Sequence, residues 1–491
     1  MSARADLGTL EASGLVEIAA LQPELEYLFR HALVQEAAYA SLLKQDRRAL
    51  HLAAAETILL LHPGRERELG GVIGMHFEQG GDAVSASEHL AVAGEHALER
   101  FANKEAVGFF ARAFMLADAS QVDLRLRAAI GGAKAGWTYS EPGTDIDRLE
   151  QALVEADHAD PRLITAAYFW VAFLRRQRGE VPESSPALRE ALERGAQMGE
   201  ALNDPAAAAL PKAFMGAVAA FTGHLREGAV EMRQALDSIE DKGDPLSAAM
   251  VADFLAFTYA RLGDFAAAEE MHMRSARIAG EGDAIARLDT DIAASAISLE
   301  RGELDKASAR AMQCAARAED LGAYACVLAS NVMFGAATLA LDDAPAAKVP
   351  VERGNELGKV TNMAPMRNLI QGLLGSVRAQ LGDLPGGAAA WDQALANARA
   401  MNDRYSEAQT LWGRARTTAR QPTPDWGSAL TDLDRAIELF EAMETRPSLA
   451  RALHDRALAL RGLGRSGEAD DVDRRSRALG VELGLKDAYF V

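Results

Sequence analysis

Residues that could hold a phosphate, a metal ion or a nucleophile are few in this chain, and their spacing argues against each chemistry. The string Gly354-Asn-Glu-Leu-Gly358-Lys359-Val360 comes nearest to a phosphate-binding loop. Such a loop needs four residues between its glycines and a Ser or Thr after the lysine, so that backbone amides surround the phosphates and the hydroxyl meets Mg²⁺. Here three residues intervene and Val360 follows, so we expect no nucleotide site at this position.

Metal and nucleophile patterns are equally weak. His272 lies between Met271 and Met273, but consecutive helical residues point in different directions and cannot converge on one ion. His89 and His96 are seven residues apart, which on a helix separates them by roughly 10 Å along the axis. The sequence contains no Gly-x-Ser-x-Gly and no His-Glu-x-x-His motif. We therefore predict that the chain is not an enzyme, holds no metal and uses no cofactor.

Charge and composition exclude further classes of protein. The chain has 491 residues, with 52 Lys and Arg against 71 Asp and Glu, and a net charge of −19. A nucleic-acid surface needs clustered cations, so we expect no nucleic acid to bind this chain by itself. Two cysteines provide no disulfide framework, and no apolar run of about 18 residues predicts a membrane span. These features favour a cytoplasmic protein that contacts no membrane.

One pattern of small residues recurs along the chain. A small residue is followed by Gly or Asp seven positions later, by a small residue five later, and by another seven later. Successive copies start 38 to 44 residues apart. The regular copies are Ala172/Gly179/Ser184/Ala191, Gly216/Gly223/Gly228/Ala235, Ala256/Gly263/Ala268/Ser275, Ser295/Gly302/Ala307/Cys314, Gly335/Asp342/Ala347/Gly354, Gly375/Gly382/Gly387/Ala394 and Ala457/Gly464/Ala469/Ser476. An expanded copy joins Gly413 to Ala429 and Ala436 through the turn Gln421-Pro422-Thr423-Pro424.

The spacing predicts pairs of antiparallel helices. The first small residue lets one helix touch its partner, and the Gly or Asp occupies a tight turn in which φ is often positive. The last two small residues are seven apart and share one face of the second helix. The pattern resembles the tetratricopeptide repeat, although the bulky aromatic expected early in the first helix is missing at Ala252, Asp291 and Gln371. The resemblance, over residues 62–491, implies an all-α fold, an α-solenoid wound as a right-handed superhelix.

The first sixty residues follow another pattern. Residues 7–13 read as a short helix, and alternating apolar residues at 16–21 and 25–29 flank Gln22-Pro23-Glu24, which predicts a β-hairpin. A long amphipathic helix is expected from His31 through Leu61. The string from Phe29 to Tyr39, followed by Arg47-Arg48 and His51, resembles the end of the winged-helix module in bacterial STAND and AAA-type ATPase regulators. These regulators include LuxR-type activators and nucleotide cyclases with an ATPase and a tetratricopeptide arm.

This resemblance implies three parts of the chain. They are a partial winged-helix module with its connecting helix at 1–61, irregular tetratricopeptide-like helices at 62–161, and the regular superhelix of about 40-residue repeats at 162–491. It also implies that His31 contacts a nucleotide or a neighbouring domain in the longer protein. The alternative interpretation is that His31 caps the long helix.

The concave side of such a superhelix is lined by the first helix of each pair. Counting from the small residue of these helices places eight larger side chains there, and their mixture of aromatic and arginine residues suits a peptide or protein segment. They are Phe169, Phe173, Arg176, Asp253, Phe257, Arg261, Arg414 and His454. The alternative is that these residues pack within the groove or solvate it.

The sequence therefore favours a binding protein. The resemblance implies the sensor arm of a bacterial signalling or transcription-regulating ATPase, which receives a peptide, protein or small effector in its groove. The alternatives are a stand-alone tetratricopeptide scaffold or peptide receptor, and the regulatory C-terminal part of a nucleotide cyclase. An upstream ATPase or cyclase domain is an expected partner in two of these three hypotheses, and the oligomeric state stays open.

Overall fold

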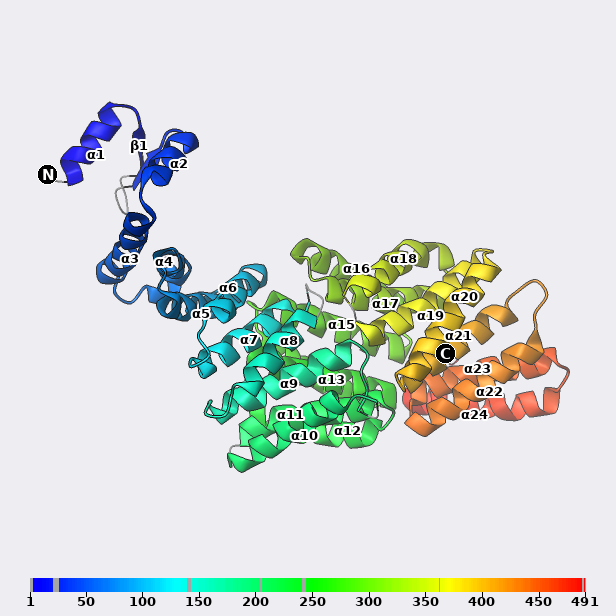
Figure 1. The fold of residues 1–491 in the computed structure, drawn as a ribbon. Coiled ribbons are helices and arrows are strands. Elements are labelled where there is room, and N and C mark those ends of the chain that lie inside the picture. Colours follow the sequence, from blue (N-terminus) through cyan, green and yellow to red (C-terminus); the bar gives the residue numbers. More distant parts are fainter. Residues whose placement is uncertain are drawn as a thin grey trace.

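The fold consists almost entirely of helices. The computed structural model describes residues 3–20, 26–138, 143–182, 184–203, 205–240, 244–361, 363–487 and 490. These described residues form 24 helices and one two-stranded antiparallel sheet. The α-solenoid of tetratricopeptide-like helix pairs predicted from the repeats is confirmed (Figure 1).

Eight successive helix pairs correspond to the eight copies of the small-residue pattern. Their first helices are α9 (Pro161–Gln177), α11 (Pro205–Phe221), α13 (Pro245–Leu262), α15 (Ala284–Arg301), α17 (Tyr324–Ala340), α19 (Ala364–Gln380), α21 (Arg404–Ala419) and α23 (Arg446–Gly462). Their second helices are α10 (Pro186–Ala201), α12 (Leu225–Ile239), α14 (Phe265–Ala279), α16 (Leu304–Leu321), α18 (Ala344–Val360), α20 (Leu384–Ala400), α22 (Trp426–Met443) and α24 (Ser466–Leu483).

Five further helices lie directly before these pairs: α4 (Glu66–Gly80), α5 (Ala83–Glu99), α6 (Asn103–Leu116), α7 (Val122–Gly136) and α8 (Gly143–Val154).

The turns between paired helices confirm the conformation that the pattern predicts. Each regular copy has a positive φ at its Gly or Asp, and the values range from +61° at Asp342 to +105° at Gly223. An L-amino acid other than Asn or Asp is strained in this region, which explains why only Gly and Asp occur there. The expanded copy differs, because its turn is longer and α22 starts only at Trp426.

Small residues also let the two helices of a pair approach closely. A Cβ atom on Gly228 of α12 would lie 2.2 Å from the carbonyl oxygen of Gly216 on α11, and one on Gly387 would lie 2.8 Å from the carbonyl oxygen of Gly375. No side chain fits at such distances. The small residues of the pattern are therefore required by backbone contact between helices.

The superhelix closes on itself. Helix α23 contacts both α13 and α15, which precede it by several pairs. Gly263, in the turn after α13, lies against Leu483 at the end of α24, so a Cβ there would be 2.7 Å from a leucine methyl carbon. Val181, Ala364 and Met401 form a further buried cluster between distant pairs. These contacts between non-neighbouring repeats are the feature that encloses space inside the array.

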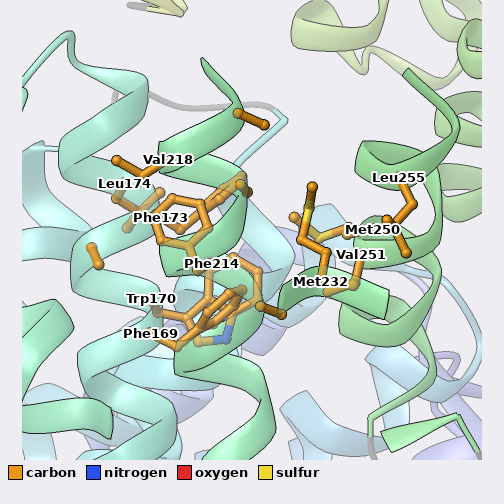
Figure 2. Packing of buried hydrophobic residues seen from close by; sticks show 14 of the residues in the cluster. Phe169, Trp170, Phe173, Leu174, Phe214, Val218, Met232, Met250, Val251 and Leu255 are labelled. Atoms are coloured by element: carbon orange, nitrogen blue, oxygen red, sulfur yellow. The ribbon is translucent and has the colours of Figure 1, made fainter. Parts of the chain in front are cut away.

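An aromatic core fills the first regular pairs. Phe169, Trp170 and Phe173 project from α9 toward Phe214 on α11, and the rings meet edge-on or stacked at centroid distances of 5.4 to 6.2 Å (Figure 2). Met232 of α12 and several residues of α13 extend the same cluster. Burial of these large side chains stabilises the array by roughly 1.5–3 kcal/mol each.

The N-terminal segment projects from the rest of the molecule (Figure 1). It contains α1 (Ala3–Ala12), then strands β1 (Val16–Ala20) and β2 (Glu26–Phe29), which pair antiparallel as the hairpin pattern predicts. The predicted turn Gln22-Pro23-Glu24 lies outside the described residues.

The prediction of a single long helix from His31 through Leu61 is wrong. Two helices, α2 (Ala32–Ser41) and α3 (Lys44–Leu61), meet at Leu42 and Leu43, whose backbones are extended with ψ of 140° and 148°. The break lets the two helices take different partners, because α2 contacts β2 while α3 packs on α4. Helix α2 buries none of its residues, and Leu33 is 78% exposed.

Within the described residues, no helix is long and apolar enough to cross a membrane.

Candidate ligand-binding cavity

A cavity of about 510 Å³ lies inside the closed part of the superhelix. Its wall is formed by the first helices α13, α15, α17, α19 and α21, and α23 with residues Lys486 and Asp487 completes it. The volume falls in the range of about 300–1,000 Å³ that is typical of ligand pockets. The geometry therefore provides a concave, partly enclosed space of ligand size.

Small residues on the inner helix faces keep this space open. The lining includes Ala260, Ala296, Ala336, Gly372 and Gly413, each from a different first helix. A large residue at any of these positions would project into the cavity. The alanine and glycine content of the sequence thus serves both close helix packing and an open interior.

Apolar side chains cover much of the wall. They are Phe257, Leu299, Val332, Met333, Leu339, Leu369, Leu373 and Trp412. Trp412 is held in place because its indole Nε1 donates a 2.6 Å hydrogen bond to Asp455 on α23. This wall would bury the apolar part of a ligand.

One end of the cavity is closed by a buried ionic cluster. Arg451 on α23 lies between Asp487, at 2.9 Å, and Glu300 on α15, at 3.5 Å. Its Nη2 also donates a hydrogen bond to the carbonyl oxygen of Glu300 at 2.8 Å. The backbone amide of Lys486 donates a hydrogen bond to the carbonyl oxygen of Arg301 at 2.8 Å. We call Arg451, Glu300, Asp487 and Lys486 the clasp, because they join residues 446–487 to α15.

Burial and the carboxylates of the clasp shift the pKa values of Arg451 and of the neighbouring Tyr405. Burial alone would lower the pKa of Arg451, but the carboxylates of Asp487 and Glu300 outweigh this effect and raise it. Burial, and then the Glu300 carboxylate, raise the pKa of Tyr405 well above its usual value. Tyr405 therefore keeps its proton, and its hydroxyl donates a hydrogen bond to Glu300 Oε1 at 2.9 Å.

The opposite end contains Arg416 of α21 and Arg420, which directly follows α21, and the two share one carboxylate. Arg420 Nη1 lies 2.5 Å from Asp342 Oδ1, and Arg416 Nη2 lies 3.4 Å from the same oxygen. Arg416 Nη2 also donates to the carbonyl oxygen of Ala340 at 3.0 Å. Asp342 occupies the positive-φ turn after α17, so these bonds join α21 to α17 across α19.

Two of the eight predicted groove residues line this cavity. Phe257 contributes to the apolar wall, and Arg261 lies beside the clasp. The Arg261 guanidinium carbon is 3.7 Å from the ring centroid of Tyr405, a cation–π contact. The structure brings these two residues together because both lie on the inner face of α13, four positions apart.

The placement of Phe169 and Phe173 in the groove is wrong. Both are buried in the aromatic core with Phe214 (Figure 2), since α9 packs on both α7 and α11 here. Arg176 and Asp253 are likewise buried, at 3% exposure each, and neither lines the cavity.

The placement of Arg414 and His454 in the groove is also wrong. Arg414 makes two 2.7 Å hydrogen bonds to Asp432 on α22, and His454 Nδ1 lies 3.4 Å from Asp473 on α24. Both side chains turn toward the acidic second helix of their own pair. The position of a residue within the first helix does not show which way its side chain turns, because that direction depends on where a carboxylate lies on the partner helix.

His31 occupies the residue that precedes α2. Its φ of −134° and ψ of 123° are those of an N-cap, but its side chain makes no capping hydrogen bond and is exposed. The position fits the capping interpretation, whereas the side chain does not act as the cap. A contact with a nucleotide or a neighbouring domain stays a prediction.

The sequence interpretation missed the clasp and the paired arginines. Arg416 and Arg420 are four residues apart, a spacing that on a helix could have identified a cationic face. Arg451 and Glu300 are 151 positions apart, and no sequence pattern relates them. Among the described residues, no group of three His, Cys, Asp or Glu side chains could hold a metal ion.

No protein-family model matches the sequence, and no curated protein matches it. Among solved structures, a Rap protein complexed with competence and sporulation factor has a TM-score of 0.56 at 12% identity, over 74% of this chain and 99% of that one. The apo quorum sensor NprR from B. thuringiensis has a TM-score of 0.46 at 14% identity, over 73% and 97%.

A signal-transduction ATPase with numerous domains and a tetratricopeptide repeat sensor, from Pyrococcus horikoshii, has a TM-score of 0.37 at 12% identity. That match covers 98% of this chain and 59% of the other. At these identities, the similarity to the Rap protein shows a shared fold: this chain is a tetratricopeptide-like helical array.

Proposed function

We propose that this chain is a non-catalytic receptor arm that binds a peptide, a protein segment or a small effector inside its superhelix. The observation that carries the proposal is the cavity of about 510 Å³, which is lined by five successive first helices and closed by the clasp. Its mixture of an apolar wall and charged ends suits a flexible ligand with a few polar groups. The Rap protein of similar fold, which was solved with competence and sporulation factor, supports this proposal.

Binding would act on the curvature of the array. The clasp and the Arg416–Asp342 bond join segments that are distant in sequence, so a ligand between them favours the closed arrangement. A ligand shifts such an equilibrium only by its difference in affinity for the open and closed states. The output of the receptor arm is thus a change in how tightly the superhelix is closed.

We further propose that the arm belongs to a bacterial STAND-type regulator and passes this change to an upstream ATPase through residues 1–61. The support is the exposed apolar surface of this segment, where Leu28, Leu33 and Leu43 are 59%, 78% and 71% exposed. His31 lies on the same segment and is the residue we assign to that contact. A stand-alone peptide receptor and the regulatory part of a nucleotide cyclase are the alternatives. The two buried free cysteines favour a reducing cytoplasm.

Selection from a displayed random-peptide library with the whole chain as bait tests the receptor proposal. Peptides should be enriched, and their affinity should fall at least tenfold, or about 1.4 kcal/mol, for Ala336→Leu, because the larger side chain projects into the cavity and occupies space that the ligand needs. The matched control is Ala309→Leu on α16, which adds the same atoms at an exposed position outside the cavity lining.

Equally weakened binding in both variants would contradict the cavity as the binding site. Enrichment of no peptide at all would remove the peptide proposal.

A further inference from the structure

The cavity lining is more cationic than the chain as a whole. It contains five cationic side chains and four carboxylates, although the chain carries a net charge of −19. The cations are Arg261, Arg416, Arg420, Arg451 and Lys486, and the carboxylates are Glu300, Asp305, Asp342 and Asp487. A surplus of positive charge in an enclosed space of an acidic protein favours an anion there.

The surplus is located at one end. At the clasp end, Arg261, Arg451 and Lys486 are balanced by three carboxylates, since Asp305 follows the Gly302 turn that lies against Asp487. At the other end, Arg416 and Arg420 share the single carboxylate of Asp342. The unbalanced positive charge therefore belongs to the Arg416–Arg420 pair.

This pair also has free hydrogen-bonding capacity. Within the described part of the chain, the side chain of Arg420 donates only to Asp342, at 2.5 Å, and it is 38% exposed. A guanidinium group carries five N–H donors in a planar fork that matches a carboxylate or a phosphate. Arg416 is held more firmly, because it is 12% exposed and bonded to Ala340. Arg420 can thus turn to a ligand while Arg416 stays in place.

The distance between the two ends limits the ligand. Tyr405, at the clasp end, and Arg416 lie eleven residues apart on α21, which is roughly 16 Å at 1.5 Å per residue. Leu369 and Leu373 of α19 and Trp412 line the space between them. An anionic group at Arg420 would therefore be followed by an apolar body that points toward the clasp.

Resting on the proposed function, we propose that the ligand is a peptide with a carboxylate, which Arg420 and Arg416 bind in competition with Asp342. The carboxylate comes either from an acidic side chain or from the peptide C-terminus, and both have the same chemistry. Asp342 fixes the arginines when the cavity is empty, and it sets the affinity because an incoming anion must displace it from Arg420.

The test uses peptides enriched by selection on the whole chain, synthesised in four forms: free or amidated at the C-terminus, and with acidic residues kept or changed to their amides. Titration calorimetry should show at least about tenfold weaker binding for the form without the critical carboxylate, since that form cannot accept the charge-assisted hydrogen bond. The pair of forms that differs identifies the source of the carboxylate. Arg420→Gln should abolish the difference.

Asp342→Asn provides a test in the opposite direction. It removes the competing charge and keeps the side-chain shape, and Asn tolerates the φ of +61° at this turn. The carboxylate peptide should bind this variant several-fold more tightly than the parent chain. The matched control is Asp434→Asn, because Asp434 pairs with Arg456 at 2.6 Å, is similarly exposed and lies outside the cavity lining; its affinity should equal that of the parent.

Equal binding of all four peptide forms, or unchanged binding by Asp342→Asn, would overturn this inference and leave the receptor proposal standing. Failure to enrich any peptide would overturn this inference together with the peptide form of the receptor proposal. Circular dichroism of each variant shows whether the helical array is intact.

Discussion

Two carboxyl groups inside the array titrate far from their usual range. Burial, followed by repulsion from Asp289, raises the pKa of Asp253 well above its ordinary value of 3.8. Burial raises the pKa of Asp289 to about 7, although a hydrogen bond from the Cys326 thiol to Asp289 Oδ1, at 3.6 Å, opposes the shift. Because α13 and α15 hold these residues, the protonation of both affects the packing of the two helices that form one wall of the cavity.

This arrangement predicts that stability decreases as pH rises. A folded-state pKa above that of the unfolded chain gives stabilisation that is complete below about pH 4 and is lost as pH rises through the folded-state value, about 7 for Asp289. The melting temperature should therefore be higher at pH 5 than at pH 8. Asp253→Asn, which is neutral at both pH values, should raise the melting temperature at pH 8 by more than it does at pH 5.

The exposed Asp434→Asn variant is the control, and its melting temperature should equal that of the parent chain at both pH 5 and pH 8. A melting temperature of Asp253→Asn that is lower than that of the parent at pH 8 would contradict the assignment of a buried carboxyl held against ionisation.

Of the residues predicted for the groove, Phe257 and Arg261 line the cavity, whereas Phe169 and Phe173 lie in the aromatic core and Arg414 and His454 face second helices. Ligand contact by Phe257 and Arg261 stays a prediction. Helical periodicity shows which residues share a face, and that is sufficient where the neighbouring surface is uniform. It does not show that an acidic partner such as Asp432 will attract an arginine away from the groove.

The turns are the elements that the sequence specifies most completely. The seven regular copies each predicted a tight turn at one position, and all seven positions have positive φ. Some of these glycines also contact the next turn of the superhelix: a Cβ on Gly263 would meet Leu483 at 2.7 Å, whereas one on Gly464 would meet no atom within 4 Å. A substitution at Gly464 therefore tests backbone strain alone, whereas one at Gly263 tests backbone strain together with packing against the next turn of the superhelix.

Replacement of each glycine by alanine should destabilise the chain to a different extent. Gly464→Ala should reduce the free energy of unfolding by about 1–2 kcal/mol, the cost of a left-handed backbone for an L-residue. Gly263→Ala should have the same backbone cost and should lose about 1–3 kcal/mol more, because the new methyl group overpacks against Leu483. Urea unfolding of both variants measures the difference, and equal destabilisation would contradict close contact between α13 and α24.

The break between α2 and α3 shows where element prediction failed. The amphipathic pattern continues from 31 to 61, but Leu42 and Leu43 adopt extended backbones because the two halves pack on different partners. A pattern of apolar residues contains no information on which partner each half takes.

At the scale of the whole molecule, closure of the superhelix is the property that sequence reasoning did not reach. A repeat predicts how each pair stacks on the next, whereas small rotations accumulate to bring α23 onto α13 and α15. Arg451 and Asp487 then become buried against Glu300, at 7%, 5% and 6% exposure. Their burial is a consequence of closure and not of any local motif.

Removal of the central cation should open the array. Arg451→Ala leaves Glu300 and Asp487 buried without their partner, which should cost about 3–5 kcal/mol of stability for a broken buried ion pair. Because the clasp joins non-neighbouring repeats, we expect separation of α23 from α15 with the helix pairs intact. Small-angle X-ray scattering should show a larger radius of gyration at unchanged helix content. Arg456→Ala, which removes a partly exposed pair with Asp434, should leave the radius unchanged.

Hydrogen exchange with and without an enriched peptide shows whether the ligand binds inside the closed superhelix. Amide exchange should become slower in α17, α19 and α21, whose inner faces line the cavity, and at the clasp residues Lys486 and Asp487. Slower exchange confined to the second helices α16, α18 and α20 or to residues 3–61, with the cavity helices unchanged, would contradict binding inside the superhelix.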